Sequence, residues 1–256
     1  MLKTRKEKIK VVKELLQQHK ALSPQLFDNN GLLLPSVRKK LLNLAEYIKI
    51  RYLPVFPQSK IEDIRIVGSS CGYNYREYGD LDFFIILDKI FPEQQERYQS
   101  ALRNFNSFLV RQPWQPVIHN HKLDFSIMDT TNVKGLCRNN YSVLKDEWVI
   151  KPVYKKFPFT AEELFQKYCK FSAELHNFVS NLEKKNDVFL TRDSCLKLSA
   201  YLNDIRNKAY NYDVEYEYSE EYNIYRLAKR FGTYMHFNKY INDSMKYLMR
   251  NTPDEV

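Results

Sequence analysis

Two neighbouring stretches decide the fold: IRIVGSS at residues 64–70 and GDLDFFIIL at residues 79–87. The first stretch predicts a β-strand that ends in a turn at Gly68. The second predicts a strand whose residues after Asp82 are apolar on both faces, which is typical of a central, buried strand. The alternating segment KLDFSIM at residues 122–128 predicts a third strand. Together these segments predict a small β-sheet.

Helical patterns surround the predicted strands. Apolar residues at intervals of three and four predict a helix from Pro35 to Tyr52, and residues 92–111 predict another. Beyond residue 155 every periodic pattern is helical, starting with a capping box at Thr160. Further helices are predicted over residues 192–210 and, twice, after Ser219. We therefore expect an α+β protein, with a sheet domain and N-terminal helices at residues 1–155 and a helical domain at residues 156–256.

The composition of the 256-residue chain narrows the classes of protein to which it can belong. Apolar residues make up 44% and charged residues 28%, which is typical of a globular protein. The longest strictly apolar run, Phe83 to Leu87, is far shorter than the ~20 residues that a membrane span needs. Four cysteines without a C-x-x-C pair argue against a zinc ribbon and a disulfide framework. We expect a soluble, intracellular protein with no membrane partner.

The formal net charge of +9 is spread unevenly, with +5 in residues 1–20 and about +4 in the rest of the chain. Residues 1–20 contain seven lysines and arginines but only two glutamates, and a C-terminal helix contains Arg226, Lys229 and Arg230. Either segment can bind a phosphate backbone, or it can be the solvated face of an amphipathic helix. For the N-terminal segment, the second alternative turns Val11, Val12, Leu15 and Leu16 inward.

Carboxylates at the start of the central strand suggest a metal site. Asp80 and Asp82, at positions i and i+2, project from the same face, and two anions there are costly unless a cation offsets them. Carboxylate oxygens suit Mg²⁺, with Mn²⁺ as an alternative. Asp124, at the start of the polar face of the third strand, is the candidate third ligand, and Asp129, five residues further on, is its rival.

The turn before these carboxylates suggests a phosphate site. Gly68 lets the backbone approach a phosphate closely, and Ser69 and Ser70 supply hydroxyl donors. Each feature is weak alone, but their order along the chain makes a stronger combination.

Gly68-Ser69, Asp80-Leu81-Asp82 and Asp124 together resemble the motifs of the DNA polymerase β-type nucleotidyltransferase superfamily. A closer likeness, over most of residues 20–235, is to predicted nucleotidyltransferases of bacteriophages, although Gly79 stands where serine commonly precedes the first aspartate. The resemblance implies a small mixed β-sheet core with flanking helices, followed by a helical C-terminal domain. It also implies a place in the cytoplasm of a bacterial or phage-infected cell.

The resemblance further implies a reaction. Asp80, Asp82 and Asp124 would be catalytic and would bind Mg²⁺, while Gly68, Ser69 and Ser70 would bind the triphosphate of an NTP. A nucleoside monophosphate would move to an acceptor hydroxyl on an RNA 3′ end such as that of tRNA, on a small molecule or on a protein. The alternatives are a non-catalytic module acting as antitoxin, inhibitor or RNA binder, and a toxin that modifies tRNA or protein.

Several other residues admit two interpretations. His119 and His121 are two apart but have no further cysteine or histidine partner, so we interpret them as loop residues and not as zinc ligands. Tyr73 and Tyr75, between the turn and the aspartate pair, either contact a base or ribose or pack against the fold. Trp148 either stacks on a substrate or is buried.

Overall fold

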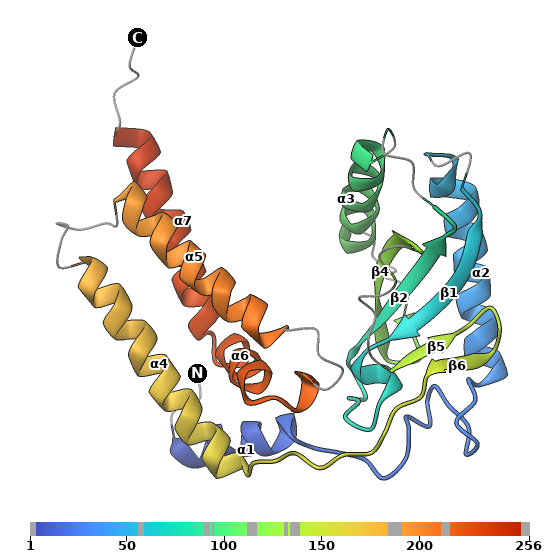
Figure 1. Cartoon of the computed structure of the whole chain (residues 1–256), viewed down its shortest axis with the longest axis horizontal. Coiled ribbons are helices and arrows are strands. Elements are labelled where there is room, and N and C mark those ends of the chain that lie inside the picture. The colour runs from blue at the N-terminus through green and yellow to red at the C-terminus, as the bar shows by residue number, and fades with distance from the viewer. Residues whose placement is uncertain are drawn as a thin grey trace. The chain divides into compact units, whose positions relative to one another are not determined.

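The computed structural model describes residues 4–55, 59–89, 93, 95–111, 117–130, 133, 139–183, 191–210 and 216–251. The chain divides into two compact units, labelled by element in Figure 1. We call Gln17–Lys155 the sheet unit, and Met1–Leu16 together with Lys156–Val256 the helical unit.

The sheet unit contains a mixed six-stranded sheet, in the order β3-β4-β2-β1-β5-β6. The strands are β1 (Ile61–Val67), β2 (Asp80–Leu87), β3 (Val117–Ile118), β4 (His121–Asp129), β5 (Asn140–Ser142) and β6 (Glu147–Ile150). Of the strand pairs that the structure describes, β2–β4 is parallel and the others are antiparallel. The three strands expected from the sequence are β1, β2 and β4, and β2 lies between the other two, which confirms an α+β fold with a central second strand.

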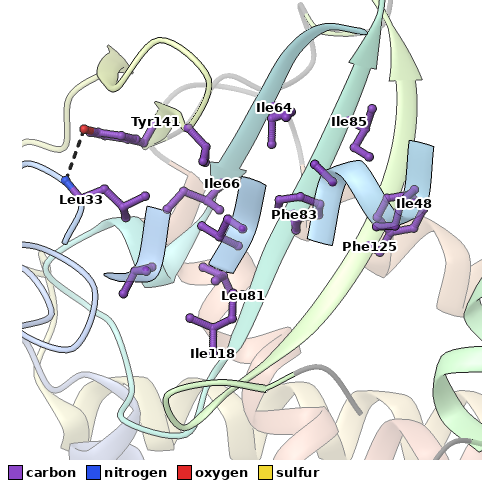
Figure 2. Close-up of a cluster of buried hydrophobic side chains, with 14 of the residues drawn as sticks. Leu33, Ile48, Ile64, Ile66, Leu81, Phe83, Ile85, Ile118, Phe125 and Tyr141 are labelled. Carbon is purple, nitrogen blue, oxygen red and sulfur yellow. Dashed lines mark hydrogen bonds between the residues drawn. The ribbon is translucent and has the colours of Figure 1, made fainter. Parts of the chain in front are cut away.

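One face of the sheet forms the hydrophobic core with helix α2 (Pro35–Tyr52). Alternate strand residues such as Ile66, Phe83 and Phe125 point into this core (Figure 2). They pack in one cluster with the α2 residues Leu41 and Ile48, which are fully buried. Each such side chain contributes about 1.5–3 kcal/mol by its burial. Helix α3 (Gln95–Arg111) contacts β4, and Tyr98 of α3 donates a hydrogen bond to the Ile127 carbonyl.

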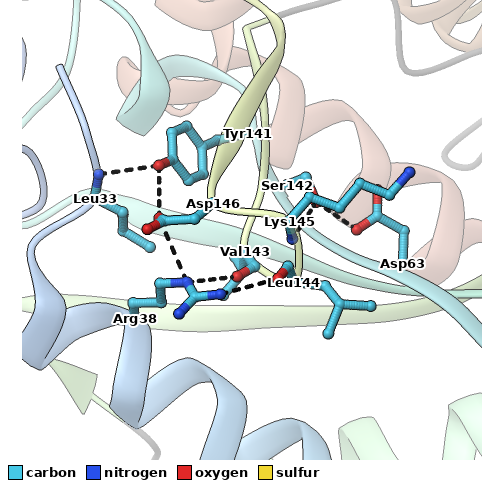
Figure 3. Close-up of polar contacts among 9 residues, drawn as sticks. All are labelled: Leu33, Arg38, Asp63, Tyr141, Ser142, Val143, Leu144, Lys145 and Asp146. Atoms are coloured by element: carbon cyan, nitrogen blue, oxygen red, sulfur yellow. Dashed lines mark hydrogen bonds and ion pairs between the residues drawn. The ribbon is translucent and has the colours of Figure 1, made fainter.

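The short strands β5 and β6 were not expected from the sequence, and polar contacts hold the turn between them (Figure 3). Arg38 of α2 donates hydrogen bonds of 2.9 Å to the carbonyls of Val143 and Leu144. The buried Ser142 hydroxyl donates to the Asp63 carboxylate at 2.6 Å, and Arg65 donates to the same carboxylate at 2.7 Å. These bonds anchor a hairpin that is too short to show a strand pattern.

The helical unit consists of α1 (Arg5–Leu15), α4 (Ala161–Glu183), α5 (Arg192–Ala209), α6 (Glu220–Arg230) and α7 (Thr233–Asn251). The four helices expected after residue 155 are therefore present. Helix α1 was expected within the sheet domain, but its buried Val12 and Leu15 pack against Leu164 of α4 and Leu227 of α6. Its inward apolar face thus makes it part of the helical unit. None of the described helices is both long and apolar enough to cross a membrane.

Candidate functional site

The turn after β1 brings the backbone against a carboxylate. Gly68 has φ +82° and ψ −157°, a conformation that is open almost only to glycine. A Cβ atom at this position would lie 2.6 Å from Oδ2 of Asp82, well inside van der Waals contact. Glycine at position 68 therefore serves two purposes: it permits the turn, and it leaves room for the Asp82 carboxylate.

The strand register brings the predicted carboxylates together on one face. Asp82 of β2 is the direct partner of Asp124 of β4, and Asp80 lies two residues before Asp82. Because Leu81 and Phe83 point into the α2 core, the side chains of Asp80 and Asp82 project from the opposite face. In a parallel pair, partner residues project from the same face, so Asp124 joins them.

The carboxylates of Asp80 and Asp124 interact electrostatically at the open end of this face. Asp80 and Asp124 are exposed and Asp82 is half-buried, because the central strand begins at the edge of the core. Partial desolvation, and then the negative charge of Asp80, raise the pKa of Asp124 above its usual value. A bound cation would relieve this repulsion.

The donors fit a hard divalent cation in type, since all three are carboxylates on one face. Within the described ranges, however, no three histidine, cysteine, aspartate or glutamate side chains form a ready-made metal-binding group. The site thus has the residue types that a hard cation needs, on one face of the sheet, but not a ready-made arrangement of three ligands.

Asp129, the rival third ligand, lies elsewhere. It pairs with Leu87 at the far end of the two strands, and its odd spacing from Asp124 places it on the core face. It is buried near Tyr98, and burial together with the charge of Asp129 raises the pKa of Tyr98 to about 12. The shared face with Asp80 and Asp82 therefore favours Asp124.

The two serines of the turn differ in their surroundings. Ser69 is half-buried, so part of its side chain reaches solvent. Ser70 is 2% exposed, and its hydroxyl donates a 2.6 Å hydrogen bond to the Asp80 carbonyl. The hydroxyl expected to bind phosphate at position 70 is thus engaged with the backbone, which leaves Ser69 as the accessible hydroxyl.

The two histidines also differ. His119 lies in the turn between β3 and β4 with φ +52°, as a loop residue. His121 is fully buried as the first residue of β4, and its Nδ1 lies 3.0 Å from the Gly79 carbonyl oxygen. Our interpretation as a loop residue was therefore wrong for His121. Its spacing of two from Leu123, on the core face, was the signal in the sequence.

The aromatic candidates are engaged within the fold. Tyr75 is buried and stacks on His19 with ring centroids 3.9 Å apart, which supports packing over nucleotide contact. Tyr73 is half-buried and meets Tyr154 edge to face at 5.5 Å. The Trp148 indole N–H donates a 2.7 Å hydrogen bond to the Gly31 carbonyl, so this polar group is bonded within the sheet unit.

The two basic segments belong to the same unit. On α6, Arg226 lies over the Tyr222 ring, Lys229 lies over the Tyr225 ring, and Arg230 lies 4.0 Å from the Glu14 carboxylate of α1. On α1, Lys6 and Lys10 are exposed one turn apart. Segments far apart in the sequence thus contribute cations to one body.

Comparison with known proteins adds no relative: no family model and no curated protein matches the sequence, and no solved structure matches the fold. The chemistry must therefore be inferred from the site itself. A glycine turn beside three carboxylates on one sheet face is suited to hold a polyphosphate through a divalent cation.

Proposed function

We propose that the sheet unit is a nucleotidyltransferase of the DNA polymerase β type, which transfers a nucleoside monophosphate from an NTP to an acceptor hydroxyl. The pairing of Asp82 with Asp124 in the β2–β4 register is the main support. It joins residues that are distant in sequence on the face that Gly68 borders. The order of turn, aspartate pair and strand aspartate is the one expected from the sequence.

Asp80, Asp82 and Asp124 are the residues that would hold Mg²⁺, or Mn²⁺ in its place. When bound, the divalent cations neutralise phosphate charge and lower the pKa of the acceptor hydroxyl. The exposure of Asp80 and Asp124 leaves their carboxylates accessible to a substrate from solvent.

The chain's own groups position the nucleotide and move a proton. The triphosphate lies against the turn that Gly68 permits, where Ser69 donates from its partly accessible hydroxyl. The acceptor oxygen bonds to the α-phosphorus, the bond from the α-phosphorus to the bridging oxygen breaks, and pyrophosphate leaves. Asp124 takes the acceptor's proton as a general base.

Transfer of label from each α-³²P NTP, with Mg²⁺ and total cellular RNA or lysate, tests this proposal. Asp80→Ala, Asp82→Ala and Asp124→Ala should each reduce labelling at least ~10³-fold, because removing one charged ligand disrupts the site. Asp129→Ala is the control and should keep most activity. Loss in Asp129→Ala with activity retained in Asp124→Ala would overturn the assignment of the third ligand.

We propose RNA as the acceptor. The exposed Lys6 and Lys10 of α1 and the cations of α6 lie in one helical unit, which suits a phosphate backbone. The label itself separates the alternatives: on RNA it supports this acceptor, on protein it indicates a protein-modifying toxin. A protein that binds RNA and transfers no label would be the non-catalytic module.

A further inference from the structure

Asp80 and Asp82 are held in different ways, although they are only two residues apart. Asp82 is paired on both sides, with Val67 of β1 and with Asp124 of β4. Among the described strands, Asp80 is paired with Lys122 of β4 alone, because the β1–β2 ladder ends at Val67. The chain leaves the sheet at Gly68, so no β1 residue faces Asp80. Its backbone therefore needs support from outside the ladder.

Ser70 provides this support on the β1 side. Its hydroxyl donates a 2.6 Å hydrogen bond to the carbonyl of Asp80 itself, and the side chain is 2% exposed. A buried hydroxyl is costly to leave without a partner, so this bond fixes the two groups to each other. Ser70 thus takes the place of the strand that ends at Val67.

His121 provides the second support, one residue earlier. Its Nδ1 lies 3.0 Å from the Gly79 carbonyl oxygen, which can only accept, so Nδ1 carries the hydrogen. The other ring nitrogen is buried and has no hydrogen-bond partner in the part of the chain that the structure describes. The imidazole thus makes its one hydrogen bond to the peptide that joins Gly79 to Asp80.

We propose that Ser70 and His121 are positioning residues that fix the Asp80 carboxylate for cation binding. The two hydrogen bonds hold the carbonyls of residues 79 and 80, on both sides of the Asp80 Cα, and so set the direction of its side chain. The inference rests on the proposed function, because Asp80 is there a cation ligand. Both side chains are buried and reach the site only through the backbone of residues 79 and 80. Partners that orient a ligand in this way are worth about 10–100-fold in metal affinity.

Mn²⁺ binding, followed by the electron paramagnetic resonance signal of the free ion, tests the proposal without any need for turnover. Ser70→Ala and His121→Leu remove the two donors and should each weaken Mn²⁺ binding about 10-fold. His121→Asn places an amide nitrogen near the position of Nδ1 and should restore most of the affinity. Ser70→Thr keeps the hydroxyl and serves the same purpose at the other site.

Ser142→Ala is the matched control for stability. It removes another buried serine hydroxyl that bonds within the same sheet, to Asp63, and should leave Mn²⁺ affinity unchanged. If the wild type binds Mn²⁺ and Asp80→Ala weakens it, but Ser70→Ala and His121→Leu bind as tightly as the wild type, the positioning role is wrong. If the wild type binds no Mn²⁺ at millimolar concentration, the proposed function itself fails. Equal weakening by His121→Asn and His121→Leu would also contradict the proposal.

Discussion

The two units use charge in opposite ways. The sheet unit gathers the carboxylates Asp80, Asp82 and Asp124 at one end of a sheet face, where backbone register places them. The helical unit gathers cations through packing, because buried Val12 and Leu15 bring α1 into the cluster that contains Leu227 of α6. Strand register fixes the positions of individual carboxylates, whereas the packing of amphipathic helices brings together cations spread over a broad surface. The first arrangement suits chemistry at one phosphorus atom, and the second suits a diffuse polyanion.

The largest effect should come from closing the space beside Asp82. Gly68→Ala introduces a Cβ 2.6 Å from Asp82 Oδ2 at a φ of +82°. We expect nucleotidyl transfer to fall at least ~100-fold, because a misplacement of about 1 Å in a reacting constellation costs that much. The measurement is the initial rate of label transfer from an α-³²P NTP.

Gly232→Ala in the helical unit is the matched control. Its φ of +79° also disfavours alanine, but a Cβ there meets no atom within 4 Å. It should lower stability by about 1–3 kcal/mol and leave transfer unchanged. Equal loss of transfer in both variants would mean that strain, and not the approach to Asp82, explains the effect.

A smaller effect, on local stability, should come from Leu15→Ala in α1, and it should show to which unit α1 belongs. Leu15 is 4% exposed, and Leu15→Ala should destabilise the helical unit by about 2–5 kcal/mol. Hydrogen exchange of the full chain should then quicken in α1, α4 and α6 and stay unchanged in β1 and β2. Leu81→Ala, in the fully buried centre of the sheet unit, should give the reverse pattern. Faster exchange in the sheet after Leu15→Ala would contradict this assignment.

The smallest effect should come from removing the exposed lysines of α1, and it should appear in the salt dependence of RNA binding. Replacing Lys6 and Lys10 with glutamine should lower the slope of log affinity against log salt for a tRNA pool by about 0.7 per lost phosphate contact. Deleting α1 is unsuitable, because it would also remove Val12 and Leu15 from their cluster. Lys197→Gln and Lys208→Gln on α5 remove two exposed lysines that already pair with aspartates, and should leave the slope unchanged. An identical slope in both pairs would remove RNA as the partner of this surface.

The sequence predicted the parts of the fold that have a long periodic pattern. Helices α1 to α7 were expected, as were the three strands that form the centre of the sheet. Strands β3, β5 and β6 have only two to four residues, too few for alternation to show. The hydrogen bonds of Arg38 and Ser142, which hold the β5–β6 hairpin, join residues about 80 to 105 positions apart.

The residue types of the candidate site were predictable from the sequence, but the hydrogen bonds that hold its backbone were not. Asp80, Asp82 and Asp124 were recognised by spacing, and parity along one strand already separates Asp124 from Asp129. The pairing of Asp82 with Asp124 required the register of a parallel pair, which local sequence does not encode. His121 was misjudged and the hydrogen bond of Ser70 was not foreseen, because the partners of both side chains are backbone carbonyls, which carry no signature in the sequence.

The position of the label in the nucleotide tests the central claim most directly. Wild-type protein and Asp82→Asn are incubated with Mg²⁺, total cellular RNA and lysate, and each of the four NTPs labelled with ³²P at either the α- or the γ-phosphate. We predict that label from one or more α-labelled NTPs stays on the acceptor with the wild type alone, and that γ-label never does, because it leaves in pyrophosphate. Retention of γ-label would indicate a kinase. Transfer of no label, or equal transfer by Asp82→Asn, would contradict a nucleotidyltransferase built on these carboxylates.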